Sequence, residues 1–244
     1  WQQTGRPVET VFEEVFARTC ARERVPLGHR TELARLQMLE DLQRFAADPP
    51  RLEGWSVHLE RDIDFGLGEE TRIRGRIDRH DVSPDRAAVV FDFKYSSAPS
   101  IRKRIRGYDE GRSVQGALYL LGLEAQRGYR PAGWFYWGLR RELYGNGWHA
   151  LGTAREYPGT ACTPEELRER LEKARTVTLE AARRIREGRI EADPADPDRC
   201  EYCPFRDVCR IRGAGLQPAM PQAEPPAPRG RPVPGKALVA GGAA

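Results

Sequence analysis

The sequence has no apolar run long enough to cross a membrane, which takes about 18 residues or more. We therefore expect no transmembrane helix and no membrane partner. No signal peptide is visible at the start, and no internal repeat occurs along the chain. The chain opens on Trp1 rather than on methionine, from which we expect a mature fragment or a domain cut from a longer protein.

The chain has few cysteines, and their number is odd. The chain has five: Cys20, Cys162, Cys200, Cys203 and Cys209. An odd number argues against a disulfide framework. Three of them form the motif Cys200-x2-Cys203-x5-Cys209, and thiolates at such short spacing hold iron–sulfur clusters or zinc. We therefore expect a reducing, cytoplasmic compartment, with free thiols as the remaining alternative.

The length and charge of the chain set broad limits. With 244 residues it can form one large domain, or one domain with appendages, and can bury a sizeable core. The formal net charge of +4 is modest, but 31% of the residues are charged and many are arginines, which suits a surface that meets phosphates. A GC-rich genome would also give a composition rich in arginine and alanine.

Residues 71–82 and 87–96 are predicted to form two strands joined by a turn. Strand alternation places Ile73 and Ile77 on one face of the first strand and Asp78 on the other. In the second strand, valines and aromatic residues surround Asp92 and Lys94, which indicates a central strand. A charge there is costly unless it is paired or bound to metal. The hairpin therefore suggests a site for a divalent cation and an anionic substrate, the alternative being a solvated charged face.

Three short motifs follow one another along the chain: Gly75-x2-Asp78, Asp92-x-Lys94 and Gln115-x3-Tyr119. This ordered set resembles the PD-(D/E)XK nuclease superfamily, and more narrowly the nuclease domain at the C-terminus of RecB- and AddB-type helicase-nucleases. The resemblance covers residues of roughly 55–210. It implies an α/β fold with a restriction-endonuclease-like core, a mixed central sheet flanked by helices, and a C-terminal cysteine-cluster segment.

The resemblance also implies roles for these residues. Asp78, Asp92 and the carbonyl of Phe93 would hold Mg²⁺ or Mn²⁺, because magnesium prefers oxygen ligands. Lys94 would orient or help to deprotonate the attacking water and offset the developing negative charge. The superfamily uses a further acid upstream, for which Glu60 is the candidate and a strand-edge surface glutamate the alternative.

Gln115 and Tyr119 lie one helical turn apart and share a face of a predicted helix. In the family this pair supports the active site and the nearby substrate. A polar side chain packed against an aromatic ring on a half-buried helix is the alternative interpretation.

For the cysteines, the resemblance implies a four-iron cluster whose fourth ligand lies far upstream and staples the two ends of the domain. Cys20 is the candidate for that ligand. Cys162, or a cysteine lost with missing residues, is the alternative, and zinc is the alternative metal. The family also carries a Gly-x3-His segment ahead of the core, and its first cysteine usually precedes that segment. Here the segment Gly5-Arg6-Pro7-Val8-Glu9 has glutamate in the histidine position, and Cys20 follows it. That departure would alter metal affinity unless the alignment itself is wrong.

The run Arg102-Lys103-Arg104-Ile105-Arg106 follows the predicted catalytic strand. These basic side chains are expected to bind DNA phosphates that flank the scissile one, and a solvated charged loop is the alternative.

We expect four segments along the chain. They are an N-terminal helical segment over 1–54, the nuclease core over 55–190, a cysteine segment over 191–213 and a disordered tail or linker over 214–244. Helices are predicted over 8–24, 31–47, 113–126 and 164–187, and strands over 55–66, 71–82, 87–96, 134–139 and 147–152.

The function that follows is metal-dependent hydrolysis of DNA phosphodiester bonds. We expect action on DNA ends or single strands, as the nuclease part of a helicase-nuclease in recombination and double-strand-break repair. The motor would be a missing domain or a partner subunit, because the chain has no helicase motif. The alternatives are a catalytically inactive, nuclease-like DNA-binding module held by an iron–sulfur or zinc site, and a zinc-stabilised RNA-binding or scaffolding domain.

Overall fold

The structure is a computed structural model that describes residues 5–152, 157–189, 192, 194 and 197–209. It divides into two units, Trp1–Arg189 and Ile190–Ala244, and each is described by itself. The predicted tail over 214–244 lies outside the described residues. No helix in the described part of the chain combines the length and the apolar character needed to span a bilayer.

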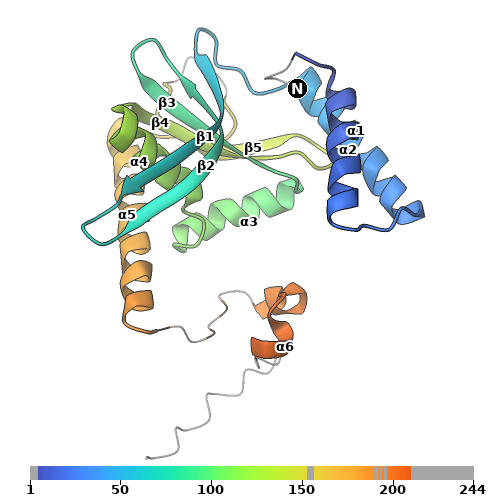
Figure 1. Cartoon of the computed structure of the whole chain (residues 1–244). Helices are drawn as coiled ribbons and strands as arrows, with labels where there is room; N and C mark the ends of the chain where they lie inside the picture. The colour runs from blue at the N-terminus through green and yellow to red at the C-terminus, as the bar shows by residue number, and fades with distance from the viewer. Residues whose placement is uncertain (1–4, 153–156, 190–191, 193, 195–196, 210–244) are drawn as a thin grey trace, which may run out of the picture. The chain divides into compact units, whose positions relative to one another are not determined.

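The first unit is built on a mixed six-stranded sheet in the order β1-β2-β3-β4-β5-β6 (Figure 1). Its strands are β1 (Ser56–Gly66), β2 (Arg72–Val82), β3 (Ala87–Lys94), β4 (Arg130–Gly138), β5 (Tyr144–His149) and β6 (Thr160–Ala161). The β3–β4 and β5–β6 pairs are parallel and the others are antiparallel. The mixed sheet with flanking helices confirms the predicted α/β fold, and β3 is central within it, as its valine- and aromatic-rich sequence indicated.

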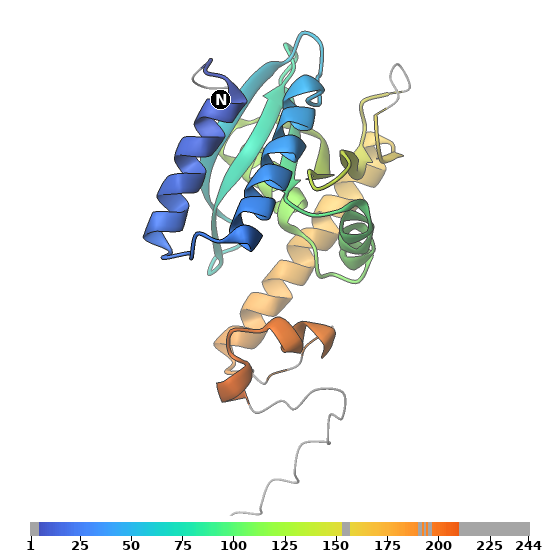
Figure 2. The same cartoon turned by 90° about the vertical axis from the view of Figure 1, so that its right-hand side faces the viewer.

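Five helices of this unit flank the sheet: α1 (Val8–Arg22), α2 (His29–Ala47), α3 (Ala98–Asp109), α4 (Gln115–Arg127) and α5 (Pro164–Arg186). Helix α4 packs against β1, β3 and β4, α5 packs against α4 and β4, and α1 and α2 lie side by side (Figure 2). The described part of the second unit holds a 3₁₀ helix, Pro197–Tyr202, and the short helix α6 (Arg206–Cys209).

Helix α5 shows how closely local sequence can determine an element. The Thr163 hydroxyl accepts a hydrogen bond from the Glu166 N–H, and the Glu166 carboxylate accepts one from the Thr163 N–H. Pro164 opens the helix, where its missing N–H costs nothing. These two bonds form a capping box, which the sequence Thr163-Pro164-Glu165-Glu166 favours.

Helix α3 is a correction to the sequence-based prediction. Residues 102–106 were open to interpretation as a charged loop, but they lie within the helix Ala98–Asp109. Its buried positions include Ala98, Ile101 and Tyr108, spaced three and seven residues apart. That spacing is helical, yet it was masked because basic residues fill most of the remaining positions.

Two apolar clusters occupy the two faces of the sheet. The first joins Val90, Trp134 and Tyr136 to buried residues of α4 and α5. The second contains Val89, Phe91 and Phe135. Because side chains alternate along a strand, Asp92 shares the face of Val90, toward the first cluster.

Asp41 joins α2 to the carboxyl end of β3. Its side chain is fully buried, and its carboxylate accepts hydrogen bonds from the Tyr95 hydroxyl at 2.9 Å and from the Arg141 N–H at 3.0 Å. Arg44 donates a third at 2.9 Å. The predicted N-terminal helical segment is therefore attached to the loop that follows Lys94.

The Asp41→Ala substitution is expected to destabilise the fold by about 1–3 kcal/mol, because it removes a fully buried carboxylate that accepts hydrogen bonds from the Tyr95 hydroxyl and the Arg141 N–H. Urea denaturation measures this free energy of unfolding. Glu40→Ala is the matched control: Glu40 is the exposed neighbour and binds only the Arg44 side chain among the described residues. Equal stability of the two variants would contradict the role assigned to Asp41.

Candidate active site

The candidate site lies where β2 and β3 separate. These strands pair over only four residues each, from Val82 with Ala88 to Arg79 with Phe91. Extending that register by one step places Asp78 opposite Asp92. Strand β3 meanwhile stays paired with β4 as far as Lys94. The strand pair therefore opens at the two aspartates while the central strand continues beyond them.

Asp78 makes a side-chain contact just beyond the point where the β2–β3 backbone pairing ends. Its Oδ2 accepts a hydrogen bond of 2.8 Å from the Phe93 N–H. The carboxylate thus bridges from β2 to β3, one residue beyond Asp92. In this way the β2 aspartate is fixed against the strand that carries Asp92 and Lys94.

The side-chain alternation of β2 breaks at Asp78. Ile77 belongs to the first apolar cluster, whereas Arg79, two residues later, lies over the Phe91 ring, which belongs to the second. Strict alternation would put both on one face. Opposite Asp78 on β1, Glu60 has a φ of 47°, a left-handed conformation that costs a non-glycine residue about 1–3 kcal/mol. The break in β2 and the left-handed residue opposite it on β1 together explain how the Asp78 side chain reaches β3. Regular alternation would have placed that side chain on the same face as Arg74 and Arg76.

Asp92 is a buried carboxylate in an unsatisfied state. Its side chain is 1% exposed, and neither carboxylate oxygen accepts a hydrogen bond of acceptable angle from a described residue. Lys94 Nζ lies 2.6 Å from Asp92 Oδ2 as an ion pair. Burial raises the pKa of Asp92, the Lys94 ammonium offsets part of that rise, and the Asp78 carboxylate adds to it. Two acids and one amine therefore share one electrostatic environment.

This arrangement fits a divalent cation. A carboxylate as buried as Asp92 is costly with a single ammonium beside it, and a hard cation is the ligand that would satisfy its remaining oxygen. Asp78 and Asp92 supply the oxygens, with the Phe93 carbonyl as the third predicted ligand. Glu60 is exposed, and its charge acts on Arg76. Within the described residues, no three His, Cys, Asp or Glu side chains are gathered as a ligand set, so Glu60 does not join the two aspartates.

The remaining motif residues meet at the same place. Gln115, the first residue of α4, donates a hydrogen bond of 2.8 Å to the Tyr119 hydroxyl. A Cβ on Gly75 would lie 3.0 Å from Tyr119 Cε1, so the glycine of the first motif makes room for the tyrosine of the third. Burial raises the pKa of Tyr119, and the carboxylates of Asp92 and Asp78 raise it further, against the bond from Gln115. Tyr119 is thus a protonated phenol close to both acids.

A family model described as the PD-(D/E)XK nuclease superfamily matches residues 2–210. The chain belongs to this superfamily. The match confirms the broad family predicted from the three motifs, and it supports nuclease activity. Members of the superfamily typically use divalent metal ions such as Mg²⁺, in agreement with the donor set at Asp78 and Asp92.

Other comparisons add little about this PD-(D/E)XK protein. No curated protein matches its sequence. Among the solved structures that match, one described as "Crystal structure of SSO0001" has 12% identity, covering 83% of this chain and 80% of that one, at a TM-score of 0.40. A likeness that weak carries no argument about site or substrate.

Two residues near the PD-(D/E)XK site are not part of the sequence-based prediction. Tyr136 pairs with Asp92 in the β3–β4 register; its hydroxyl donates to the Ser113 carbonyl at 2.7 Å. The sequence indicated only that Tyr136 belongs to a buried strand, which it does. The second such residue is Asp41. A single aspartate on a predicted helix does not indicate from sequence which residues it will contact.

The basic residues predicted to bind DNA lie on α3. Arg102 is exposed, with its guanidinium carbon 5.1 Å from the centre of the Tyr144 ring. Lys103 and Arg106 are also exposed, whereas Arg104 is half-buried. The four therefore do not share one environment.

Glu9, in the position where the family has histidine, lies in the first turn of α1. It accepts a hydrogen bond of 2.9 Å from Gln43 of α2 on the exposed surface. This bond lowers the pKa of Glu9.

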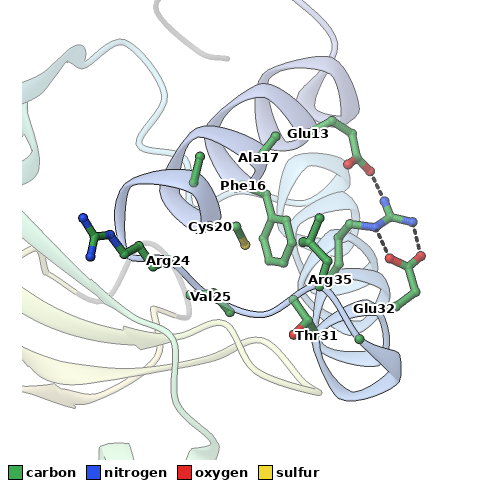
Figure 3. A pocket seen from close by; sticks show the side chains of 12 residues that line it. Glu13, Phe16, Ala17, Cys20, Arg24, Val25, Thr31, Glu32 and Arg35 are labelled. Carbon is green, nitrogen blue, oxygen red and sulfur yellow. Dashed lines mark hydrogen bonds and ion pairs between the residues drawn. The ribbon is translucent and has the colours of Figure 1, made fainter.

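The upstream cysteines have separate surroundings. Cys20 is buried and lines a pocket of about 700 Å³ between α1 and α2, together with Phe16, Val25 and Arg35 (Figure 3). The Cys162 thiol donates a hydrogen bond of 3.4 Å to the His149 carbonyl, and burial raises its pKa. Both belong to the first unit.

Cys200, Cys203 and Cys209 belong to the second unit, where they are half-buried free thiols. The donor chemistry suits iron–sulfur or zinc ligation, but the described residues do not gather three of these thiols around a common point. The cluster and its fourth ligand stay predictions.

Proposed function

We propose that this protein is a Mg²⁺- or Mn²⁺-dependent deoxyribonuclease. The observation that carries the proposal is the buried Asp92 carboxylate, which is 1% exposed, pairs with the Lys94 ammonium at 2.6 Å and shares its surroundings with the Asp78 carboxylate. A site that only stabilised the fold would be better served by apolar or hydrogen-bonded groups. A site prepared for a cation and a phosphate has a reason to keep this charge.

Each side chain of the site has a distinct task in phosphodiester hydrolysis. Asp78 and Asp92, with the Phe93 carbonyl, would hold the metal ion, which when bound supplies Lewis acidity and charge neutralisation at the phosphate. The Lys94 ammonium orients the attacking water and offsets the charge that develops as its proton leaves. Gln115 donates a hydrogen bond to the Tyr119 hydroxyl, and this pair would fix one wall of the site.

A cleavage assay tests this function. End-labelled single-stranded DNA, duplex DNA and RNA of one sequence are incubated with purified protein in Mg²⁺, in Mn²⁺ and in excess EDTA. We expect both DNA substrates or the single strand alone to be cut, and EDTA to stop the reaction. DNA binding without cleavage under any metal condition would instead indicate the inactive, DNA-binding alternative.

The finer role follows the narrower resemblance. We propose action on DNA ends or single strands within a cytoplasmic helicase-nuclease, in recombination and double-strand-break repair. The support is the order of the three motifs followed by the cysteine trio. Isolation from native cells and mass spectrometry of stable partners tests this: we expect a helicase motor, as a domain of the same polypeptide or as a partner subunit. Isolation with no motor would contradict it.

The cysteine segment is proposed to hold a four-iron cluster, with zinc as the alternative. Cys200, Cys203 and Cys209 would be ligands, and Cys20 is the candidate for the fourth. Iron, sulfide and zinc analysis of anaerobically purified protein, with its visible absorbance, distinguishes the two metals. Loss of iron in Cys200→Ser and retention in Cys162→Ser is expected. Protein free of both metals after anaerobic purification would overturn the proposal.

A further inference from the structure

Arg104 occupies a position unlike that of the other basic residues of α3. The helix begins four residues after Lys94 and packs against β4 and β5. Arg104 is half-buried, and its guanidinium carbon lies 5.5 Å from the centre of the Tyr136 ring. Tyr136 is the register partner of Asp92 in the neighbouring strand. The guanidinium therefore lies over the sheet face that carries Asp92, beside the site and not out in solvent.

The charges around Asp92 support this placement. Burial raises the pKa of Asp92 most strongly, and the positive charges of Lys94 and, to a smaller extent, Arg104 lower it. Arg104 is thus close enough for its charge to act on the acid. No ion pair or hydrogen bond recorded between described residues includes Arg104.

An uncommitted arginine beside a buried acid is unusual in this protein. Arg79, also buried next to the site, is fully engaged by Asp81 through two hydrogen bonds of 2.8 and 2.7 Å. Arg76 is likewise bound to Asp62. Arg104 instead stacks on an aromatic ring, which orients the guanidinium plane while leaving its N–H donors free. Those donors match the oxygen geometry of a phosphate.

The charge balance of the site indicates which phosphate it would be. The negative charges of Asp78 and Asp92 equal the positive charges of Lys94 and Arg104. A bound divalent ion then leaves two positive charges. Phosphodiester hydrolysis develops about two negative charges on the phosphoryl group in its transition state, so the balance is best at the reacting phosphate itself.

We propose that Arg104 binds a non-bridging oxygen of the scissile phosphate and stabilises its transition-state charge, as a catalytic residue outside the three sequence motifs. This assignment rests on the proposed nuclease function. It differs from the sequence-based expectation, in which all four basic residues of 102–106 bind flanking phosphates. Arg102 and Arg106, exposed on the same helix, keep that role.

Single-turnover cleavage by saturating enzyme tests the assignment. We expect Arg104→Ala to slow cleavage by about 100-fold or more, as loss of a transition-state donor does. Its Kd for the same DNA, measured with Ca²⁺ in place of Mg²⁺, should rise by no more than about fivefold, because one phosphate contact among several supplies only part of the affinity. Added guanidinium ion should restore part of the cleavage rate of Arg104→Ala. The rate of Arg104→Lys should fall between those of the wild type and Arg104→Ala.

Arg168→Met is the matched control, because Arg168 is an arginine of α5 whose ion pair is with Glu124. Wild-type protein that cleaves, with Arg104→Ala cleaving as fast as Arg168→Met, would overturn the assignment and leave the nuclease function standing. A rise in Kd as large as the loss of rate would also overturn it, because Arg104 would then bind ground state and transition state equally. Wild-type protein that cleaves nothing would overturn the nuclease function, and this assignment with it. Thermal unfolding of each variant, and rescue by guanidinium, separate a catalytic loss from a folding defect.

Discussion

The Asp92→Asn substitution is expected to abolish cleavage and to leave the fold at least as stable as that of the wild type. Asparagine has nearly the same shape but no charge, so it removes a metal ligand without opening a cavity. Cleavage should fall by about a thousandfold or more, because both the cation and its effect on the phosphate are lost. Single-turnover kinetics measures the first effect and urea denaturation of metal-free protein the second.

The stability effect has a definite sign with pH. Burial holds the pKa of Asp92 above its ordinary value, so in metal-free protein the charged form is disfavoured in the folded state. The penalty is absent below the ordinary pKa of about 3.9 and grows as pH rises from there through the raised pKa. The stability advantage of Asp92→Asn should therefore increase across that range and then level off.

Asp62→Asn provides the opposite case. The Asp62 carboxylate is exposed and accepts a hydrogen bond from Arg76, which lowers its pKa. Its contribution to stability is therefore present above the ordinary pKa and is lost as pH falls through the lowered one. Asp62→Asn should reduce stability at neutral pH and leave cleavage intact. An Asp92→Asn protein that behaves like Asp62→Asn would contradict the unsatisfied state assigned to Asp92.

Metal addition gives a readout that does not depend on activity. A ligand that binds only the folded state raises stability by mass action. Mn²⁺ should therefore raise the thermal midpoint of the wild type and of Asp62→Asn, and should have little effect on Asp92→Asn. An equal rise in all three proteins would place the metal elsewhere.

Much of the site follows from sequence because its members lie on short, regular elements. The alternation around Asp92 and Lys94 predicted a central strand, and helical spacing put Gln115 and Tyr119 on one face. The hairpin was also predicted to bring Asp78 and Asp92 to one surface, but not the hydrogen bond by which Asp78 reaches the Phe93 N–H on β3. That contact depends on the break at Asp78 and on the left-handed Glu60 opposite it. A conformation held against local preference is imposed by tertiary packing, so the local sequence carries no sign of it.

Other features depend on contacts between distant segments. Asp41 and Arg141 are 100 residues apart, and a hydrogen bond between them leaves no periodic pattern in the sequence. Helix α3 does have a periodic pattern, in Ile101 and Tyr108, but the surrounding arginines favoured a loop interpretation. The distinct environment of Arg104 also required the structure, because it depends on the strand that supplies Tyr136.

The Lys94→Met substitution is expected to slow cleavage by about 100- to 1,000-fold and, unlike Asp92→Asn, to destabilise the metal-free protein. Lys94 is the ion-pair partner of a carboxylate that is 1% exposed, so its removal leaves a buried charge unpaired. The loss of stability should be about 1–3 kcal/mol, less than for a fully dry pair, because the Lys94 side chain is 25% exposed. Methionine keeps the length of the side chain, so little packing is lost.

A double-mutant cycle decides whether this pairing is the cause. When Asp92 is also replaced by asparagine, no buried charge remains to be satisfied, so the combined variant should regain most of the stability that Lys94→Met loses. Cleavage should stay absent in the combined variant, since the metal ligand is gone. Strictly additive stability effects would mean that the lysine and the aspartate act independently. The 2.6 Å contact would then be incidental, and the site would lack the charge coupling on which its chemistry depends.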